Sequence, residues 1–243
     1  MKRDMLIAGA LWGLLTLVGE VWALTTEFNP PGYAAEARLV DDAFQTMMVL
    51  GVPVFALVIA FLGYAVVRFR DRGDPPEDGP PLREHRPLIV GWLGVTTGLT
   101  VLVIINPGIV GMLELRHEHP ADLVVQVEGF RWAWRVHYPE YNLTTTELVL
   151  PVDQRVQFDV TATDVLHSFW IPAFRVKIDA VPGLVTRTYA TPTITGSFAG
   201  DDQLRVQCAE LCGLAHNLMR TPVRVVAQTE FDAWVAQQRA AAR

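Results

Sequence analysis

Three long apolar stretches in the first half of this 243-residue chain limit its fold more than any other feature. They are MLIAGALWGLLTLVGEVWAL (5–24), TMMVLGVPVFALVIAFLGYAVV (46–67) and LIVGWLGVTTGLTVLVIINPGIVGM (88–112). The second and third contain no charged residue, and each is long enough for a helix to cross a hydrocarbon core roughly 30 Å thick. The first stretch follows two basic residues, Lys2 and Arg3. Together they make segment 1–24, which is either a cleaved signal peptide or a retained first transmembrane helix. The sequence therefore predicts two or three N-terminal transmembrane helices.

The basic residues around these stretches predict their orientation. Five arginines lie between the second and third stretches, whereas segment 25–45 carries one arginine and four acidic residues. Cytoplasmic loops of membrane proteins are enriched in Lys and Arg. We therefore place the N-terminus and loop 68–87 in the cytoplasm, and segment 25–45 and everything after residue 112 outside. The net charge of −6 excludes nucleic-acid binding as the main function.

From residue 113 the pattern changes to short runs rich in Val, Thr and aromatic residues, separated by Gly, Pro and Asp. These runs are 123–129, 132–138, 147–151, 155–163, 184–191, 204–208 and 222–227. Many short strands at regular spacing predict an all-β sandwich or barrel, so 113–243 is expected to form one external domain. The C-terminal TEFDAWVAQQRAAAR predicts a helix with Thr229 at its N-cap and with Phe231, Trp234 and Val235 on one face.

The segment CAELCGLAHNLM (208–219) concentrates side chains that bind metals: Cys208, Cys212, His216 and Met219. Two cysteines in an exported domain often form a disulfide, but a disulfide leaves the histidine and the methionine unexplained. A zinc site would use thiolates and imidazoles without the thioether. Soft thiolate and thioether ligands together with imidazole favour copper. All three interpretations remain open at this point, with copper favoured.

A copper site in a β-sandwich needs a further imidazole from an earlier part of the chain. The favoured candidate is His167 in DVLHSFWIP, ahead of His117, His119 and His137. One thiolate is enough for a mononuclear centre, whereas two thiolates, two imidazoles, a thioether and a carbonyl are enough for two copper ions. If both sulfur atoms bridge the ions, an added electron is shared between them, which suits an electron relay.

These segments resemble subunit II of the haem–copper oxidases, the cytochrome c oxidase family. Residues 208–219 resemble its dinuclear copper (CuA) loop, and DVLHSFWIPAFRVKIDAVPG (164–183) resembles the segment of its first histidine ligand. VEGFRWAWRVHYPEY (127–141) resembles its aromatic segment. The similarity extends over about residues 35–235. It implies a membrane-anchored, all-β cupredoxin-like Greek-key sandwich with a C-terminal helix.

The resemblance also implies a role for each matching residue. His167 and His216 would be imidazole ligands, Cys208 and Cys212 bridging thiolates, Met219 the axial ligand of one copper, and the Glu210 carbonyl a ligand of the other. The Glu210 side chain would face a magnesium ion shared with subunit I. Trp132 would receive electrons from cytochrome c, and at least one of Trp132 and Trp134 is expected in the core.

The implied function is electron transfer in a respiratory terminal oxidase of the bacterial plasma membrane, with the multi-pass chain exposing its copper domain to the periplasm. Electrons would pass from cytochrome c to a haem in subunit I, which reduces oxygen to water, and subunit III is a further expected partner. Acidic residues could steer a basic cytochrome: Asp122, Glu128, Glu140, Glu147 and Asp153.

The chain departs from the family pattern at several positions. Ile89 occupies the place of a glutamate that feeds a proton path in subunit I, and Glu84 and His85 are the nearby substitutes. Phe130 and Ala133 stand where the family commonly has His and Tyr. These departures leave two alternatives open: the copper subunit of a related nitric oxide reductase, and a membrane-anchored copper carrier or assembly factor with an exposed, exchangeable metal.

Overall fold

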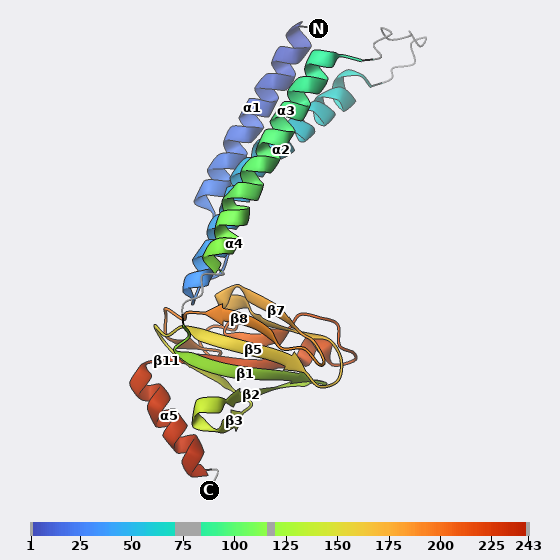
Figure 1. Ribbon diagram of the computed structural model, residues 1–243. Helices are drawn as coiled ribbons and strands as arrows, with labels where there is room; N and C mark the ends of the chain where they lie inside the picture. The colour runs from blue at the N-terminus through green and yellow to red at the C-terminus, as the bar shows by residue number, and fades with distance from the viewer. Residues whose placement is uncertain (1, 71–83, 116–119, 242–243) are drawn as a thin grey trace. The chain divides into compact units, whose positions relative to one another are not determined.

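The computed structural model describes residues 2–70, 84–115 and 120–241 (Figure 1). The centre of the expected loop 68–87, together with His117 and His119, lies outside the described residues. The chain divides into two compact units, one made of residues 1–28 and 42–116 and the other of residues 29–41 and 117–243. The second unit therefore contains a piece of chain, residues 29–41, that lies between the two segments of the first unit in the sequence.

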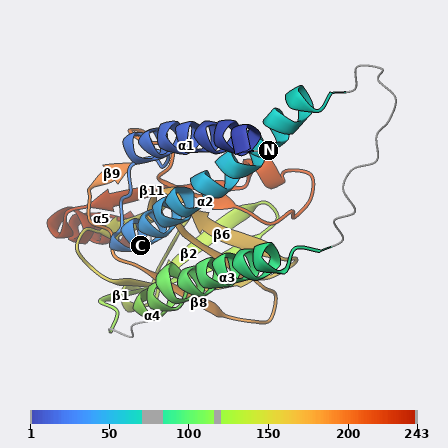
Figure 2. The same cartoon turned by 90° about the horizontal axis from the view of Figure 1, so that it is seen from above.

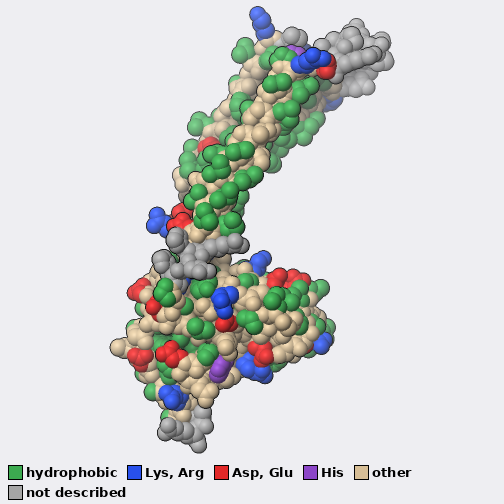
Figure 3. All heavy atoms as spheres, in the orientation of Figure 1, with side chains coloured by type: hydrophobic (Ala, Val, Ile, Leu, Met, Phe, Trp, Pro, Cys, Tyr) green, Lys and Arg blue, Asp and Glu red, His purple; other side chains and the backbone are tan. Residues whose placement is uncertain are grey.

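The first unit is helical. Its elements are α1 (Lys2–Thr25), α2 (Ala35–Arg68, which begins in the second unit), α3 (Arg86–Val103), a π-helical turn η1 (Ile104–Ile109) and α4 (Val110–Leu115). Within the part of the chain that the structure describes, three spans are long and apolar enough to cross a membrane: Lys2–Thr25, Ala35–Arg68 and Arg86–Leu115. Hydrophobic side chains cover most of the flank of this unit that Figure 3 shows. This surface matches the apolar stretches predicted from the sequence.

The first helix packs along the second (Figure 2). Side chains connect the two helices at three levels. Trp12 Nε1 donates to the Pro53 carbonyl (2.9 Å), and Gln45 Nε2 donates to the Ala23 carbonyl (2.8 Å). The Tyr64 hydroxyl donates to the Asp4 carboxylate (2.7 Å). Between these levels Gly19 lies directly against Val52, and a Cβ at Gly19 would come within 2.7 Å of its Cγ1. Helix α1 is thus fitted to α2 over its whole length.

The third span is not one regular helix. At its start, the His85 side chain accepts a hydrogen bond from the Leu88 N–H (3.3 Å) and caps α3. Near its end the backbone leaves helical geometry at Asn106 (φ −136°, ψ 116°). Pro107 follows and has no N–H to donate to the preceding turn, so the regular helix cannot continue. The predicted stretch 88–112 therefore contains a kink that hydropathy alone does not reveal.

The second unit is a β-sandwich. One sheet has the order β3-β2-β1-β5-β8, and the other has the order β4-β11-β10-β6-β7 with β9 paired to β11. The strands are β1 (Leu123–Phe130), β2 (Ala133–Tyr138), β3 (Leu143–Thr145), β4 (Leu148–Pro151), β5 (Val156–Ala162), β6 (His167–Ile171), β7 (Val176–Ala180), β8 (Thr186–Ala190), β9 (Gly196–Ser197), β10 (Arg205–Cys208) and β11 (Arg220–Val226). Short 3₁₀ turns lie at Pro139–Tyr141, Pro172–Phe174 and His216–Leu218.

The seven predicted strands are all present, with ends that shift by one or two residues. Four strands were not predicted, namely β3, β6, β7 and β9. Strands β3 and β9 have three and two residues, too few to show alternation. Strand β6 is nearly continuously buried, so it lacks the alternation typical of a half-buried strand. Strand β7 does alternate apolar and charged residues (VKIDA), but over only five positions.

Alternate residues of β1 and β5 face the core between the sheets. Tyr138 lies wholly inside it, where its hydroxyl donates to the Val149 carbonyl (2.9 Å) and accepts from the Val149 N–H (2.8 Å). Burial raises the pKa of Tyr138 far above its usual range, so it remains a neutral hydrogen-bonding group. Helix α5 (Gln228–Ala241) covers this region, with the ring centroids of Tyr138 and Trp234 5.4 Å apart.

The predicted inner face of α5 is confirmed, because Phe231, Trp234 and Val235 are all buried. The prediction of Thr229 as its N-cap is wrong. The helix begins at Gln228, and the Ala227 carbonyl accepts the first helical hydrogen bonds. The backbone reaches helical geometry directly after β11 ends at Val226, so Thr229 already lies in the first turn.

Residues 29–41 form an additional edge of the sandwich. Ala34 makes an isolated antiparallel bridge with Pro192, and backbone hydrogen bonds flank it on both sides. The Glu36 carboxylate accepts from the Thr191 N–H (2.7 Å), and Asp41 pairs with Arg175 (2.9 Å). The expected external segment 25–45 is therefore divided between the two units.

Candidate metal centre

The predicted metal ligands lie on two neighbouring strands of one sheet and on the loop that leads from the second of these strands to a third. His167 opens β6, Cys208 ends β10, and the loop 209–219 leads directly into β11. Strand β10 pairs antiparallel with both neighbours, which fixes Cys208 opposite Phe169 and close to His167. The Cys208 N–H donates to the Met219 carbonyl (3.0 Å) and so closes the base of the loop.

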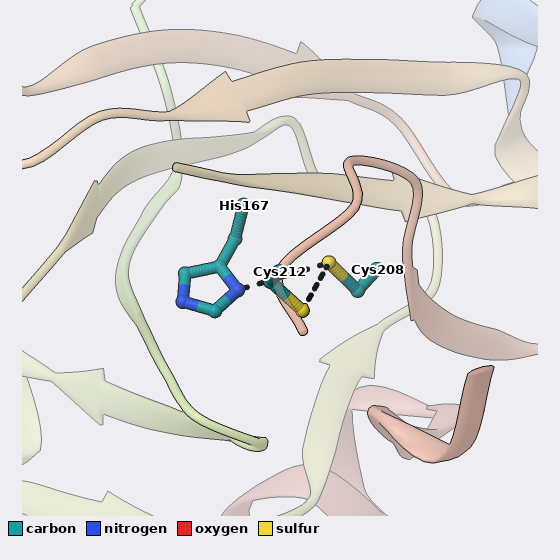
Figure 4. A group of neighbouring side chains, drawn as sticks. All are labelled: His167, Cys208 and Cys212. Carbon is teal, nitrogen blue, oxygen red and sulfur yellow. Dashed lines mark hydrogen bonds between the residues drawn. The ribbon is translucent and has the colours of Figure 1, made fainter. Parts of the chain in front are cut away.

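Six donor groups converge in this loop. His167, Cys208 and Cys212 point toward one another (Figure 4), with 3.8 Å between the two Sγ atoms and 3.8 Å from Cys208 Sγ to His167 Nδ1. Cys212 Sγ lies 3.6 Å from His216 Nδ1 and 3.8 Å from Met219 Sδ. The Cys208 thiol donates to the Glu210 carbonyl (3.2 Å). The cysteines are free, so the disulfide interpretation does not describe this structure.

These spacings suit a metal. Ligands at about 2.3 Å from a tetrahedral ion stand roughly 3.7 Å from one another. The measured sulfur–sulfur and sulfur–nitrogen distances of 3.6–3.8 Å agree with this separation. His167, Cys208, Cys212 and Met219 are all at most 5% exposed, so the donors already face inward. Thioether and thiolate donors with imidazole are the set that copper prefers.

The Cys212 thiol is not ionised at neutral pH. Burial, followed by the neighbouring Cys208 sulfur, raises the pKa of Cys212 to about 11. A thiol in this position becomes a thiolate when a cation replaces its proton. Cys212 therefore needs a cation close to its sulfur atom to act as a thiolate ligand.

Asp164 orients His167. Its Oδ1 accepts from His167 Nε2 (2.8 Å), which leaves Nδ1 directed at Cys208, and its Oδ2 accepts from the backbone N–H (2.9 Å) and the Nε (3.0 Å) of Arg131. Burial opposes ionisation of Asp164, but the hydrogen bonds from His167 and Arg131 outweigh it and hold the pKa of this carboxyl well below its usual range. Asp164 was not predicted from the sequence, although its position three residues before the histidine was the available signal.

Trp132 lies beside the cysteine loop and is 40% exposed. Its Nε1 donates to the Cys212 carbonyl (3.3 Å). Its ring packs on Gly213, where the backbone has φ +117° and where a Cβ would come within 3.4 Å of the indole. Trp134 is buried at 1% exposure, which confirms that one of the two tryptophans belongs to the core.

The remaining candidates lie elsewhere. His137 sits within β2, where its Nδ1 is 3.0 Å from Thr144 Oγ1, so it is not part of the cluster. Among the described residues, one group of at least three His, Cys, Asp or Glu side chains has ligand atoms close enough for a metal: His167, Cys208 and Cys212. Ile89 is exposed, and the neighbouring Glu84 pairs with Arg86 (3.3 Å).

Fold and site together define a class of protein: an apolar helical anchor joined to a cupredoxin-like sandwich with a soft-donor metal centre. The profile of the family described as cytochrome c oxidase subunit II, periplasmic domain, matches residues 143–227. The alternative cytochrome c oxidase subunit 2 of Bradyrhizobium diazoefficiens is 31% identical over 271 residues, covering 96% of this chain and 92% of that relative. This chain belongs to the cytochrome c oxidase subunit 2 family and is a subunit of an oxidase complex.

Two further relatives agree in sequence. Cytochrome c oxidase subunit 2 of Synechocystis is 28% identical over 283 residues, covering 97% of this chain and 83% of the relative. The solved periplasmic domain of subunit II of cytochrome oxidase from Bradyrhizobium japonicum is 33% identical. It covers 50% of this chain and 96% of its own, with a TM-score of 0.46. The two full-length relatives confirm the resemblance inferred from the sequence motifs.

Proposed function

We propose that the chain is the electron-transfer subunit of a respiratory terminal oxidase. It would accept electrons from cytochrome c, and they would continue to a haem in subunit I, where oxygen is reduced to water. The observation that carries this proposal is the convergence of donor atoms at 3.6–3.8 Å in the loop 208–219 and at His167. Two copper ions bound there (CuA) would supply reversible one-electron chemistry.

The arrangement of the donors supports a dinuclear assignment. The two sulfur atoms lie between the imidazoles, with His167 beside Cys208 and His216 beside Cys212. The weak donors are also divided, because Met219 Sδ approaches Cys212 and the Glu210 carbonyl approaches Cys208. Each copper ion would thus have one imidazole, one weak ligand and a share of both thiolates. With its ligands supplied by the protein, such a centre favours electron relay over substrate binding.

The buried donors weigh against a copper carrier, which needs an accessible and exchangeable metal. Cys208, Cys212 and Met219 are 2%, 5% and 0% exposed. The partly buried Glu210 side chain is the proposed contribution to a magnesium ion shared with subunit I. Whether oxygen or nitric oxide is reduced depends on subunit I, and gas consumption by the purified complex distinguishes the two.

We also propose a multi-pass location in the bacterial plasma membrane, with the sandwich in the periplasm and subunits I and III as membrane partners. Residues 29–41 are hydrogen-bonded into the sandwich, so both lie on the same side of the membrane. The chain between them must leave that side and return, which two crossings by α2 and α3 accomplish. The arginine-rich loop between these helices then faces the cytoplasm.

Helix α1 is expected to remain in the mature protein as a third transmembrane helix. Its hydrogen bonds to α2 through Trp12 and Gln45, and the fit of Gly19 to Val52, would all be lost if it were cleaved. The intact mass of the chain extracted from membranes checks this expectation. A mature chain that begins near residue 25 would contradict it.

Replacing Trp132 with alanine is expected to slow electron uptake from the donor protein by about 30-fold or more, because a central aromatic anchor typically contributes 2 kcal/mol or more to a protein contact. The indole also bonds the carbonyl of Cys212 and so connects the surface to the site. Stopped-flow reduction by the donor measures the effect, with copper content as the control for an intact centre. An unchanged rate at normal copper content would place electron uptake elsewhere.

A further inference from the structure

A groove of about 510 Å³ runs along one side of the contact between α1 and α2, which lie next to each other (Figure 2). The residues that line it come from 15–22 of α1 and 47–59 of α2, and all of them are apolar side chains or glycines. Glycines open the groove. A Cβ on Gly51 would meet no atom within 4 Å, and Gly19 allows α1 to approach Val52.

The dimensions of the groove suit a single hydrocarbon chain. On α2 its lining extends from Met47 to Ile59, which is about 18 Å of helix. Divided over this length, the volume corresponds to a mean cross-section of about 28 Å². A helix with its side chains is about 10–12 Å across and has a cross-section of about 80 Å² or more. A further transmembrane helix is therefore too wide to enter the groove, whereas an acyl chain is a single file of methylene groups.

The groove has the length of one leaflet. Half of a hydrocarbon core roughly 30 Å thick is about 15 Å, close to the length of the groove. On α1 the lining ends at Trp22, one turn before the helix ends at Thr25. In the orientation proposed above, this half of the membrane is the outer leaflet. Trp22 then lies at the outer interface, where tryptophan is enriched.

The outer end of the groove is aromatic. The rings of Trp22 and Phe28 meet edge to face with their centroids 5.0 Å apart, and those of Phe28 and Phe44 lie 6.0 Å apart. Aromatic faces attract ammonium groups. This end of the groove can therefore receive a cationic group as well as an apolar chain.

The charges at this end are mostly acidic. Residues 15–50 contain five acidic residues and one basic residue, Arg38. The described basic residues of the first unit lie at the opposite ends of the helices: Lys2, Arg3, Arg68, Arg70 and Arg86. A lipid with a net negative headgroup would find few cations here, whereas a headgroup that carries an ammonium group would face carboxylates and aromatic rings.

We propose that this groove is a lipid site for an amine-bearing phospholipid of the phosphatidylethanolamine class. One acyl chain lies between α1 and α2, and the ammonium group lies at the cluster of Trp22, Phe28 and Phe44. Helices in a membrane associate mainly through close packing, so a chain that fills the space over Gly51 would hold α1 against α2. The inference rests on the proposed membrane location and on the retention of α1.

The test uses the intact oxidase complex in vesicles that contain a photoactivatable phospholipid. Two probes carry the same reactive acyl chain, one with an ethanolamine headgroup and the other with a glycerol headgroup. Mass spectrometry of peptides locates the adducts after illumination. We expect the ethanolamine probe to label segments 15–22 and 47–59 about 5-fold more than the glycerol probe does, which is the preference that a cation–π contact supplies. Equal labelling by the two probes would mean ordinary contact with bulk lipid and would overturn the proposal.

Variants on α1 locate the chain and the headgroup. Val18→Trp fills the groove, because Val18 lines it and is 59% exposed, and most of the labelling at 47–59 should be lost. Leu17→Trp is the matched control, because Leu17 is 63% exposed but does not line the groove, and its labelling should be normal. Trp22→Leu should keep the labelling and lose the preference for ethanolamine. Normal labelling in Val18→Trp would contradict the proposal.

Two further readouts separate this inference from the proposals on which it depends. If the intact mass shows that α1 is absent from the mature chain, its retention and the lipid site fail together. If α1 is present but segment 47–59 cross-links to another subunit and gives no lipid adduct, a partner subunit covers the groove and the lipid site alone fails. Copper content and electron transfer should be normal in all three variants, so the proposed electron-transfer function is tested independently.

Discussion

The substitution Cys212→Ser is expected to abolish the spectroscopic signature of a mixed-valence copper pair. Cys212 Sγ is central to the donor set, with the Cys208 sulfur, the His216 nitrogen and the Met219 sulfur all within 3.8 Å. A hydroxyl is a harder and far weaker ligand for copper than a thiolate, so the second ion loses its bridge. Copper content per chain should fall from two toward one. The EPR spectrum should change from one electron shared over two nuclei to that of a single copper.

Met219→Leu is the matched control for this variant. It keeps the volume of a fully buried side chain and removes only the thioether. Both copper ions should therefore stay, with a shifted spectrum. A normal mixed-valence spectrum in Cys212→Ser would show that the two thiolates do not bridge.

The second large effect is expected at Asp164. Asp164→Ala should weaken copper binding by about 10- to 100-fold, because a hydrogen-bond partner that orients a ligand histidine typically contributes that much. His167 is completely buried, and the carboxylate is what directs its Nδ1 toward Cys208. Competition with a chelator measures the affinity, and the copper hyperfine pattern reports the orientation of the imidazole.

Two further variants separate positioning from general stability. Asp164→Asn keeps an oxygen that accepts from His167, so most of the affinity should return. Asp159→Ala is the control for stability, because it removes the ion pair of Asp159 with Arg187 (2.9 Å), which is partly exposed like that of Asp164. Asp159 lies on the outer face of β5 and contacts none of the predicted ligands. If Asp159→Ala weakens copper binding as much as Asp164→Ala does, the carboxylate at 164 acts only through stability.

The site could be predicted largely because its donors are concentrated in one short segment. Cys208, Cys212, His216 and Met219 lie within twelve residues, and their residue types alone favour copper. A lone histidine carries little information, and His167 was favoured because the cysteine loop needs a further imidazole from an earlier part of the chain; the resemblance to a family segment pointed to the same residue. Its position in space depends on the pairing of β6 with β10, which no local pattern specifies.

What the sequence could not provide depends on contacts between distant residues. Arg131 and Asp164 are ordinary charged residues in the chain, and they matter only because two turns meet at the metal end. The same holds for Trp132, whose indole donates to the carbonyl of Cys212, 80 positions further along the chain.

The edge formed by residues 29–41 also sets an order of events during synthesis. Asp41 and Arg175 are separated by 134 positions, and Glu36 and Thr191 by 155. Closing such long loops is slow, and here two membrane helices must be inserted between the contacting segments. The edge contacts of residues 29–41 therefore form last, after the strands that carry Arg175 and Thr191 have left the ribosome and folded.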